Sequence, residues 1–468
     1  MVSLFDAVPV EMDFPAEERR VLAFWKERGI FEKSLKANEG AKSFVFYEGP
    51  PTANGLPHNG HVLTRVIKDL FPRYQTMRGH YVPRKAGWDT HGLPVEVEVE
   101  KELRIHGKAE IERYGVEPFT ERCIESVFRY TAEWERLTQR IGFWVDLNEA
   151  YVTYHRGFVQ SVWWALSELF KKGLLYQGHK VVWWWPRGGT ALSAAEVGLG
   201  YKTVDDPSVY VAFPLREAPD TALLIWTTTP WTLPSNMYAA VNPSVDYVTV
   251  DAGDRKLIIA AALREELAKK LKKDLPVLST QKGRELVGKR YTPPFDTYFA
   301  KDADATLPLK DGGEDSVGWR VLAADFVTLD SGTGIVHTAP AFGEDDYDAF
   351  RKDRLRFKNP DALEMRCAVK PDGTFSEEVP LVTGRFVKDA DKDLQRNLKE
   401  RGLLIHTEQY RHEYPFCWRA DEDPLIQYAR PAWYIRTTSV IEQAKANNHP
   451  SRSCARSRAT TWPPWRRS

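Results

Sequence analysis

The 468-residue sequence has few cysteines, no excess of either charge and no long apolar run. Its four cysteines lie far apart, which argues against a disulfide framework and favours a reducing compartment, so we expect a cytoplasmic protein. The apolar run at residues 257–263 is far too short to span a bilayer, and the first residues lack a basic region followed by an apolar segment. We therefore expect neither membrane insertion nor secretion.

Charge is balanced over the chain, with 65 Lys and Arg residues against 65 Asp and Glu residues. A nucleic-acid partner would be held by local basic patches instead of by the field of the whole molecule, and charge alone neither suggests nor excludes RNA. Hydrophobic residues make up 43% of the sequence, which is enough to bury large cores in two or three domains.

A strand–helix–strand pattern lies near the start of the chain. Residues 43–47 predict a short strand, apolar residues at every fourth position from Val62 predict a helix that bends near Pro72 and ends at Gly79, and a second strand begins at Tyr81. Such a unit places the loops after both strands at one edge of a parallel sheet. We therefore expect the two loops to face each other.

The composition divides the chain into four parts. Residues 1–203 alternate between helix and strand patterns, and residues 204–408 change to short strands with frequent Pro, Gly and Asp. The first pattern returns over residues 409–448. Residues 449–468 then carry five arginines, no acid and no apolar period, and do not look like a folded element. We predict an α/β fold with a large, mainly β domain inserted into it.

Two histidines stand three residues apart at the expected helix start, in the string "YEGPPTANGLPHNGH" of residues 47–61. His58 and His61 should project from one face, and Gly60 removes a Cβ so that a ligand can approach the backbone. A helix N-terminus favours anions through its free N–H groups and its dipole. The pattern predicts a phosphate site with two donors, although on spacing alone a turn with two surface histidines is the commoner explanation.

The same string resembles the HIGH signature of class I aminoacyl-tRNA synthetases, with Asn59 in place of the usual isoleucine. The string "AGWDTHGLPVE" of residues 86–96 narrows the resemblance to the isoleucyl-tRNA synthetases. By this resemblance Asp89 binds the amino group of the amino acid, as suits a carboxylate facing a cation, while an Asx turn is the structural alternative. The resemblance assigns catalytic roles to His58, Gly60 and His61, and substrate contacts to Gly49, Pro50, Asn54 and Asp89.

Two strings in the inserted domain carry further chemistry. "IWTTTPWTLPSN", residues 225–236, forms a hydroxyl-rich loop that could hold a sugar edge and position water, although three threonines alone are more commonly a strand end. "GTGIVHTAPAFGEDDYD", residues 332–348, adds a histidine and acids that would ordinarily offset a helix dipole. Both strings resemble the editing domain of the isoleucine enzymes. The resemblance assigns Thr227, Thr228, Thr229, Asn236 and His337 to a hydrolytic pocket, and Asp346 to the substrate amino group.

The resemblance implies an isoleucyl-tRNA synthetase that activates isoleucine with ATP, usually with Mg2+, transfers it to isoleucine tRNA and hydrolyses valine products. It implies an incomplete Rossmann-like nucleotide-binding fold with an inserted editing domain, in a protein that acts as a monomer. The KMSKS loop and the anticodon-reading helical domain of a full-length enzyme do not occur in the sequence, and we interpret residues from about His449 as an out-of-frame or misassembled translation. An editing-only deacylase and an inactive binding remnant are the alternatives.

The sequence departs from relatives that carry zinc knuckles. Trp185, Gly188 and Ala420 stand where some relatives have metal ligands, only Cys417 remains, and no Cys-x-x-Cys pair occurs. We therefore predict no structural zinc. The trio Trp183, Trp184 and Trp185 is expected to pack where metal would organise the loop, with stacking on tRNA as the alternative.

Overall fold

The computed structural model describes residues 11–52 and 54–447, which form two compact units. Within these residues, unit 1 contains residues 11–175 and 435–447, and unit 2 contains residues 176–434. No helix in the described part of the chain has both the length and the apolar character needed to cross a membrane.

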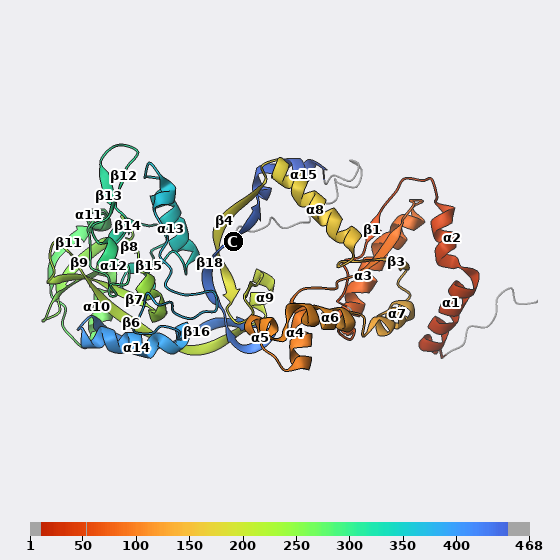
Figure 1. The fold of residues 1–468 in the computed structure, drawn as a ribbon, viewed down its shortest axis with the longest axis horizontal. Helices are drawn as coiled ribbons and strands as arrows, with labels where there is room; N and C mark the ends of the chain where they lie inside the picture. Colours follow the sequence, from red (N-terminus) through yellow and green to blue (C-terminus); the bar gives the residue numbers. More distant parts are fainter. Residues whose placement is uncertain (1–10, 53, 448–468) are drawn as a thin grey trace, which may run out of the picture. The chain divides into compact units, whose positions relative to one another are not determined.

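Unit 1 is built on a three-stranded parallel sheet whose strands, in spatial order, are β1 (Phe46–Tyr47), β2 (Arg84–Trp88) and β3 (Asp146–Val152). Phe46 pairs with Arg84, and Gly87 pairs with Tyr151. Helix α3 (Asn59–Met77) joins β1 to β2 and completes the predicted parallel strand–helix–strand unit (Figure 1).

The predicted bounds of this helix are close to those observed. α3 contains Pro72 and ends just before Gly79, whose φ of 82° is a left-handed conformation that suits glycine. The other helices of unit 1 are α1 (Phe14–Arg28), α2 (Ile30–Ala37), α4 (Leu93–Leu103), α5 (Lys108–Tyr114), α6 (Val116–Val127), α7 (Thr131–Arg140), α8 (Arg156–Lys171) and α15 (Ile441–Asn447).

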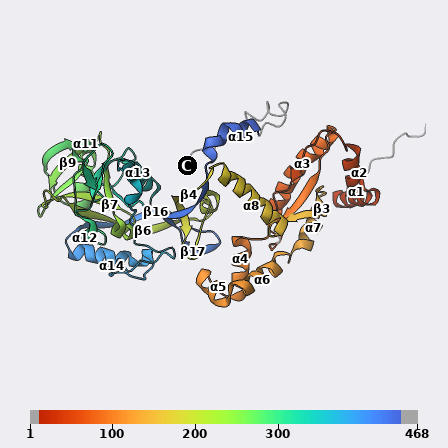
Figure 2. The same cartoon turned by 45° about the horizontal axis from the view of Figure 1, so that its top comes forward.

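Unit 2 is mainly β and has one large core. Its seven-stranded sheet runs in the order β11 (Val277–Lys282), β9 (Asp246–Asp251), β10 (Lys256–Ala260), β7 (Thr221–Thr227), β6 (Tyr201–Pro214), β16 (Leu404–Cys417) and β17 (Ala420–Pro424). Val211, Leu223 and Leu257 are fully buried in its core. Helix α14 (Val387–Glu400) packs beside β16, as both views show (Figures 1 and 2).

A second sheet of unit 2 has β8 (Tyr238–Val241) between β14 (Arg320–Ala323) and β15 (Ile335–Thr338). Tyr238 pairs with Arg320, and Ala239 pairs with His337. The short helix η1 (Pro230–Ser235) precedes β8, and helix α13 (Glu344–Arg354) follows β15. This arrangement gathers the threonine-rich string and the histidine-containing string around one small sheet.

The remaining elements of unit 2 are short or lie at its ends. The chain passes into unit 2 along β4 (Leu175–Trp185), which lies between β18 (Ile426–Ile435) and β5 (Thr190–Ala191), and it leaves along β18. The other strands and helices are α9 (Ala194–Gly198), η2 (Ala261–Leu263), α10 (Arg264–Leu271), α11 (Gly283–Leu286), α12 (Phe299–Asp302), β12 (Thr306–Pro308), β13 (Glu314–Ser316) and η3 (Pro360–Ala362).

The α/β class with a large, mainly β insertion is confirmed, but the compact units divide at other positions than the composition does. Residue 204 falls inside β6 and residue 408 falls inside β16, so the changes in composition lie within paired strands. The expected aberrant tail, residues 449–468, lies outside the described residues.

Candidate functional site

The two predicted histidines of unit 1 lie against each other at the start of α3, with ring centroids 3.7 Å apart and ring planes tilted by 34°. His58 is the N-cap, and its Nδ1 accepts a hydrogen bond from the backbone N–H of Gly60 at 3.2 Å. The Nδ1 of His61 accepts from the backbone N–H of His58 at 3.2 Å. Because both Nδ1 atoms are acceptors, each neutral ring carries its proton on Nε2. The two Nε2–H groups are therefore the donors that could meet a phosphate.

This capping changes part of the expectation for the helix start. The N–H groups of His58 and Gly60 are taken up by the two imidazoles, so the expectation of free N–H groups is met only in part. A Cβ at Gly60 would lie 3.0 Å from Cε1 of His58, so glycine makes room for the ring itself. Burial lowers the pKa of His61, and its neighbours His58 and Arg65 lower it further.

The two loops after β1 and β2 lie side by side, as the sequence predicts. The backbone N–H of Asp89 donates to the carbonyl of Pro51 at 3.0 Å, and Thr52 pairs with Asp89 in a parallel bridge. Asn54 is buried, and its Nδ2 donates to the carbonyl of Pro94 at 2.9 Å. Asp89 itself is half-buried near Tyr151, whose pKa is raised by burial and by neighbouring carboxylates.

Charged side chains hold the loop after β1 in place. Glu48 is buried, and its Oε1 lies 3.3 Å from the guanidinium of Arg65. Burial raises the pKa of Glu48, while the positive charge of Arg65 opposes this shift. Lys68 donates to the carbonyl of Gly49 at 2.9 Å, and Pro50 is half-buried beside it. These contacts hold the loop in place but leave open what it binds.

Trp134, which no local sequence pattern marks, contacts three parts of this region. Its Nε1–H donates to the carbonyl of Gly55 at 2.8 Å, and its ring meets His61 edge-on with centroids 4.7 Å apart. The guanidinium of Arg65 lies 4.9 Å from the same ring. Trp134 therefore links the loop, the second histidine and the buried cation.

In unit 2, the threonine trio lies at the end of β7 against η1. The hydroxyls of Thr227 and Thr229 are 3.2 Å apart, and the backbone N–H of Thr229 donates to the Thr227 hydroxyl at 3.1 Å. Thr228 is half-buried between them. Thr232 donates to the carbonyl of Thr229 at 2.9 Å and joins the trio to the predicted histidine.

His337 is held by hydrogen bonds on both ring nitrogens. Its Nδ1 lies 2.8 Å from Nδ2 of Asn236, and its Nε2 lies 2.9 Å from the hydroxyl of Thr232. Asn236 also donates to the carbonyl of Tyr238 at 2.9 Å, while its Oδ1 accepts from the Tyr291 hydroxyl at 2.7 Å. The amide nitrogen therefore faces His337, so the imidazole proton lies on Nε2 and points to Thr232.

This arrangement fixes the charge of His337. Burial lowers its pKa to about 3, so the ring is neutral at physiological pH. With Nδ1 accepting and Nε2 donating, neither nitrogen can take a proton from water without first breaking a hydrogen bond. His337 therefore acts as a fixed link between Asn236 and Thr232.

Asp346 lies in the first turn of α13, close in the fold to the strand that carries His337. Its Oδ2 accepts from the backbone N–H of Ala339 at 2.8 Å. Burial raises the pKa of Asp346 to about 7, and the neighbouring Asp345 adds to this shift. A carboxylate with one oxygen fixed and with so raised a pKa would be stabilised by an arriving ammonium group.

The tryptophan trio packs as expected at two of its three positions. Trp184 and Trp185 are buried, and their Nε1–H groups donate to the carbonyl of Pro371 at 2.7 Å and to Oδ2 of Asp423 at 2.8 Å. A Cβ at Gly188 would lie 2.0 Å from the Trp185 ring, so this position requires glycine. Within residues 11–52 and 54–447, no three His, Cys, Asp or Glu side chains gather to hold a metal ion. The absence of structural zinc stays a prediction.

Several residues of the two sites cannot be predicted from local sequence patterns, because their hydrogen-bond partners lie far away in the chain. Thr232 stands inside the quoted threonine string and could have been included for its hydroxyl. The others have no local signal, since the hydrogen bonds from Tyr291 and Trp134 span 55 and 79 residues. The residues missed are Trp134, Thr232, Tyr238 and Tyr291.

Comparison with known proteins gives a consistent result. A family model described as tRNA synthetases class I (I, L, M and V) matches residues 20–466. An isoleucine–tRNA ligase of Bacillus thuringiensis is 48% identical over 94% of this chain, and one of Thermus thermophilus is 47% identical over 92%. One of Streptomyces coelicolor is 48% identical over 94%. These matches cover 40%, 39% and 40% of the relatives, so the chain spans about 40% of the length of the curated relatives it matches.

A solved ternary complex of Agrobacterium radiobacter K84, agnB2 LeuRS-tRNA-LeuAMS, is also similar over 89% of this chain and 52% of its own. Its TM-score is 0.31 and its sequence identity is 18%. A likeness this low carries no argument about the sites.

Proposed function

The chain belongs to the class I tRNA synthetases, and we propose that it is part of an isoleucine–tRNA ligase whose unit 2 hydrolyses valine attached in error to isoleucine tRNA. One observation carries this proposal: a continuous hydrogen-bond chain from Asn236 through His337 and Thr232 to the threonine trio. Such a chain fixes hydroxyl groups in one geometry, which suits the binding of a ribose edge and the placing of a water molecule.

A second, hydrolytic site is needed because of the size of one methylene group. A hydrophobic pocket distinguishes substrates that differ by one methylene by only about 1–3 kcal/mol, a limit for which isoleucine and valine are the standard illustration. A pocket that admits the valine ester and excludes the larger isoleucine ester adds a second selection. In this proposal Asp346 binds the α-ammonium group of the ester, and His337 holds Thr232 in place.

Unit 1 would contribute to the synthetic reaction. We propose that the Nε2–H groups of His58 and His61 stabilise charge on the phosphates of ATP, and that Asp89 binds the isoleucine ammonium. In this proposal Mg2+ arrives with ATP, because the phosphate oxygens are ligands that Mg2+ prefers. We place the protein in the cytoplasm, in keeping with the free thiols of Cys123, Cys367 and Cys417.

The synthetic proposal has its own test. Because the chain spans about 40% of its relatives' length, we expect isoleucine-dependent exchange of pyrophosphate into ATP to be slow. Exchange at the rate of a full-length relative assayed in parallel would contradict this expectation. Side-by-side assays with isoleucine and valine report which amino acid the site selects.

The editing proposal is tested by deacylation of valyl-tRNA with the full chain and two variants. Asp346→Ala should lower the rate about 10- to 100-fold, because it removes a charge-assisted hydrogen bond to the ester ammonium. Glu344→Ala is the matched control, since Glu344 is an exposed acid in the same first turn of α13. It should keep the parental rate. A parental rate equal to spontaneous hydrolysis would contradict the proposal.

A further inference from the structure

Helix α13 carries two inward-facing carboxylates. Asp346 and Asp353 are seven residues apart, which is about two helical turns, so they lie on the same face of the helix. Asp346 contacts the backbone N–H of Ala339, directly after β15. Asp353 contacts side chains of the two other strands of the same small sheet. The helix is thus fixed to this sheet at both ends.

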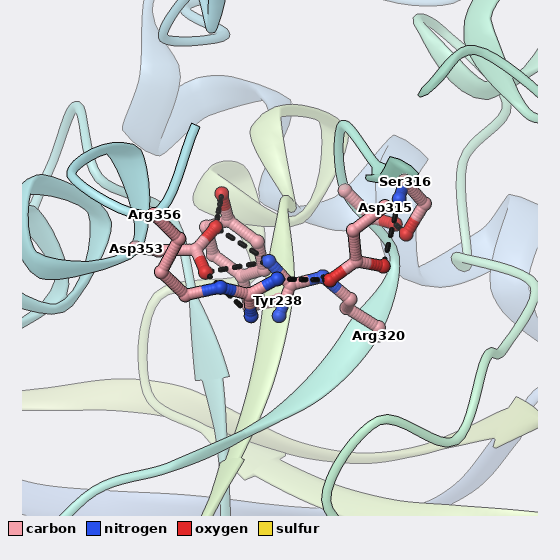
Figure 3. Close-up of polar contacts among 7 residues, drawn as sticks. Tyr238, Asp315, Ser316, Arg320, Asp353 and Arg356 are labelled. Carbon is pink, nitrogen blue, oxygen red and sulfur yellow. Dashed lines mark hydrogen bonds and ion pairs between the residues drawn. The ribbon is translucent and has the colours of Figure 1, made fainter. Parts of the chain in front are cut away.

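The contact at Asp353 is buried and specific. The guanidinium Nη2 of Arg320 donates to both oxygens of Asp353, at 2.5 and 2.6 Å, and the Tyr238 hydroxyl donates to Oδ2 at 3.1 Å (Figure 3). Arg320 and Asp353 are 3% and 5% exposed. Asp315 and Arg356 complete the cluster around this guanidinium and carboxylate (Figure 3).

Tyr238 connects this cluster to the threonine-lined site. Its hydroxyl contacts Asp353, while its backbone carbonyl accepts from Nδ2 of Asn236, the same nitrogen that faces His337. Tyr238 is fully buried at the start of the central strand β8. One residue therefore contacts both the Asn236–His337 pair and the helix that carries Asp346.

Stability alone does not account for this cluster. Burial removes the hydration of both charges, and the attraction between them hardly exceeds this desolvation penalty. Apolar residues of the same volume are therefore often as stabilising or more so. What an ion pair with a two-oxygen contact adds is a fixed position and orientation. In this helix, that position also determines where the carboxylate of Asp346 lies two turns away.

We propose that Asp353 is a positioning residue that, with Arg320 and Tyr238, holds α13 so that Oδ1 of Asp346 meets the ammonium group of an α-aminoacyl ester. The inference rests on the proposed editing function and deepens it, because it names the residues that hold the substrate-binding carboxylate in place. Esters of α-amino acids should be hydrolysed in preference to esters of the matching 2-hydroxy acids, which lack the ammonium group.

The test compares two substrates on the same tRNA, valyl and 2-hydroxyisovaleryl, using the full chain. The parent protein should prefer the valyl ester. Asp353→Asn should reduce this preference about tenfold through a higher KM for the valyl ester, because a small displacement of a binding group costs this much or more. Hydrolysis of the hydroxy ester should stay within about twofold of the parental rate.

Asp348→Asn is the matched control, because Asp348 lies on the same helix but is exposed and pairs only locally with Arg351. It should keep the parental preference. If Asp353→Asn does not fold, Tyr238→Phe replaces it, since this change removes only the hydroxyl, and it should reduce the preference about threefold.

Each remaining outcome is decisive. Equal losses on both esters, or an unchanged preference in the variant that folds, would overturn the positioning role and leave the editing function standing. A parent protein that hydrolyses valyl-tRNA without any preference over the hydroxy ester would also overturn it. A parent protein that hydrolyses neither ester would overturn the editing function and this inference together.

Discussion

The two units build their candidate sites in different ways. In unit 1, His58 is exposed, and the imidazoles of His58 and His61 are fixed by the backbone N–H groups of Gly60 and His58 within one helical turn. In unit 2, Asn236 and His337 are 2% and 7% exposed and are held by hydrogen bonds that span about a hundred residues. The comparison shows that a short motif suffices to fix the two imidazoles of the first site, whereas the polar groups of the second depend on contacts between distant parts of the chain.

The hydrophobic cores of the two units also differ, in the size of their clusters. Unit 2 has one large core cluster that includes strands of both its main sheets, with two smaller clusters beside it. Buried residues of unit 1 form small clusters such as Trp88, Trp134 and Val152, while Leu70 and Met77 of α3 are 62% and 86% exposed. Changes at the buried polar groups of unit 2 should therefore cost far more than changes at the exposed polar groups of unit 1.

The largest expected effect follows from the buried ion pair. Arg320→Met leaves the Asp353 carboxylate buried without its main partner and should destabilise unit 2 by about 3–5 kcal/mol. The contrasting variant is Arg20→Met in unit 1, whose ion pair with Glu17 is exposed and should contribute at most about 1 kcal/mol. Hydrogen exchange followed by mass spectrometry measures the opening of each unit separately. Equal losses of protection would contradict the comparison.

The next effect concerns Asp391, a carboxyl of α14 that is 6% exposed and receives a hydrogen bond from the backbone N–H of Trp231. Burial raises its pKa from 3.8 to about 7, while Lys388 lowers it and Asp206 raises it. The folded chain thus keeps a proton that the unfolded chain releases, so stability falls as pH rises from about 4 to 7.

Asp391→Asn removes this ionisation. The variant should be more stable than the parent at pH 8, by up to about 4 kcal/mol, and the difference should shrink steadily toward pH 4. Urea unfolding of the two proteins at several pH values measures this. A difference that does not depend on pH would show that ionisation of Asp391 plays no part.

The smallest effect is expected in unit 1. Trp134→Phe keeps most of the ring but removes the hydrogen bond to Gly55, which should loosen the loop before His58 by about 1 kcal/mol. Trp163→Phe on α8 is the control, because Trp163 is 68% exposed. Exchange of the loop amides reports the change. An effect on unit 1 as large as that of Arg320→Met on unit 2 would remove the distinction between them.

Much of unit 1 could be predicted from sequence because its signals are local. The periodicity from Val62 and the stop at Gly79 predicted α3, and the strand–helix–strand rule predicted that the loops after β1 and β2 meet. The capping by His58 was missed, since imidazoles rarely cap helices. It changes which nitrogen of each ring can act as a donor.

In unit 2, the sequence indicated the threonine trio, Asn236 and His337, but not how they are held. Tyr291 and Arg320 lie in strings with no turn, cap or periodic signal that marks them. Their role depends on strand pairing, such as the register of Tyr238 with Arg320, which local patterns do not specify. Composition likewise placed the domain boundaries inside β6 and β16. The residue types change partway along each of these strands, whereas unit 2 begins at residue 176 and ends at residue 434.

The central claim is that the buried polar site of unit 2 hydrolyses the smaller of two aminoacyl esters. Single-turnover hydrolysis of valyl-tRNA and isoleucyl-tRNA, both on isoleucine tRNA and with the full chain in excess, tests it most directly. We predict that the valyl ester is hydrolysed at least about tenfold faster than the isoleucyl ester. Equal rates for the two esters, or no hydrolysis above the spontaneous rate, would contradict the account.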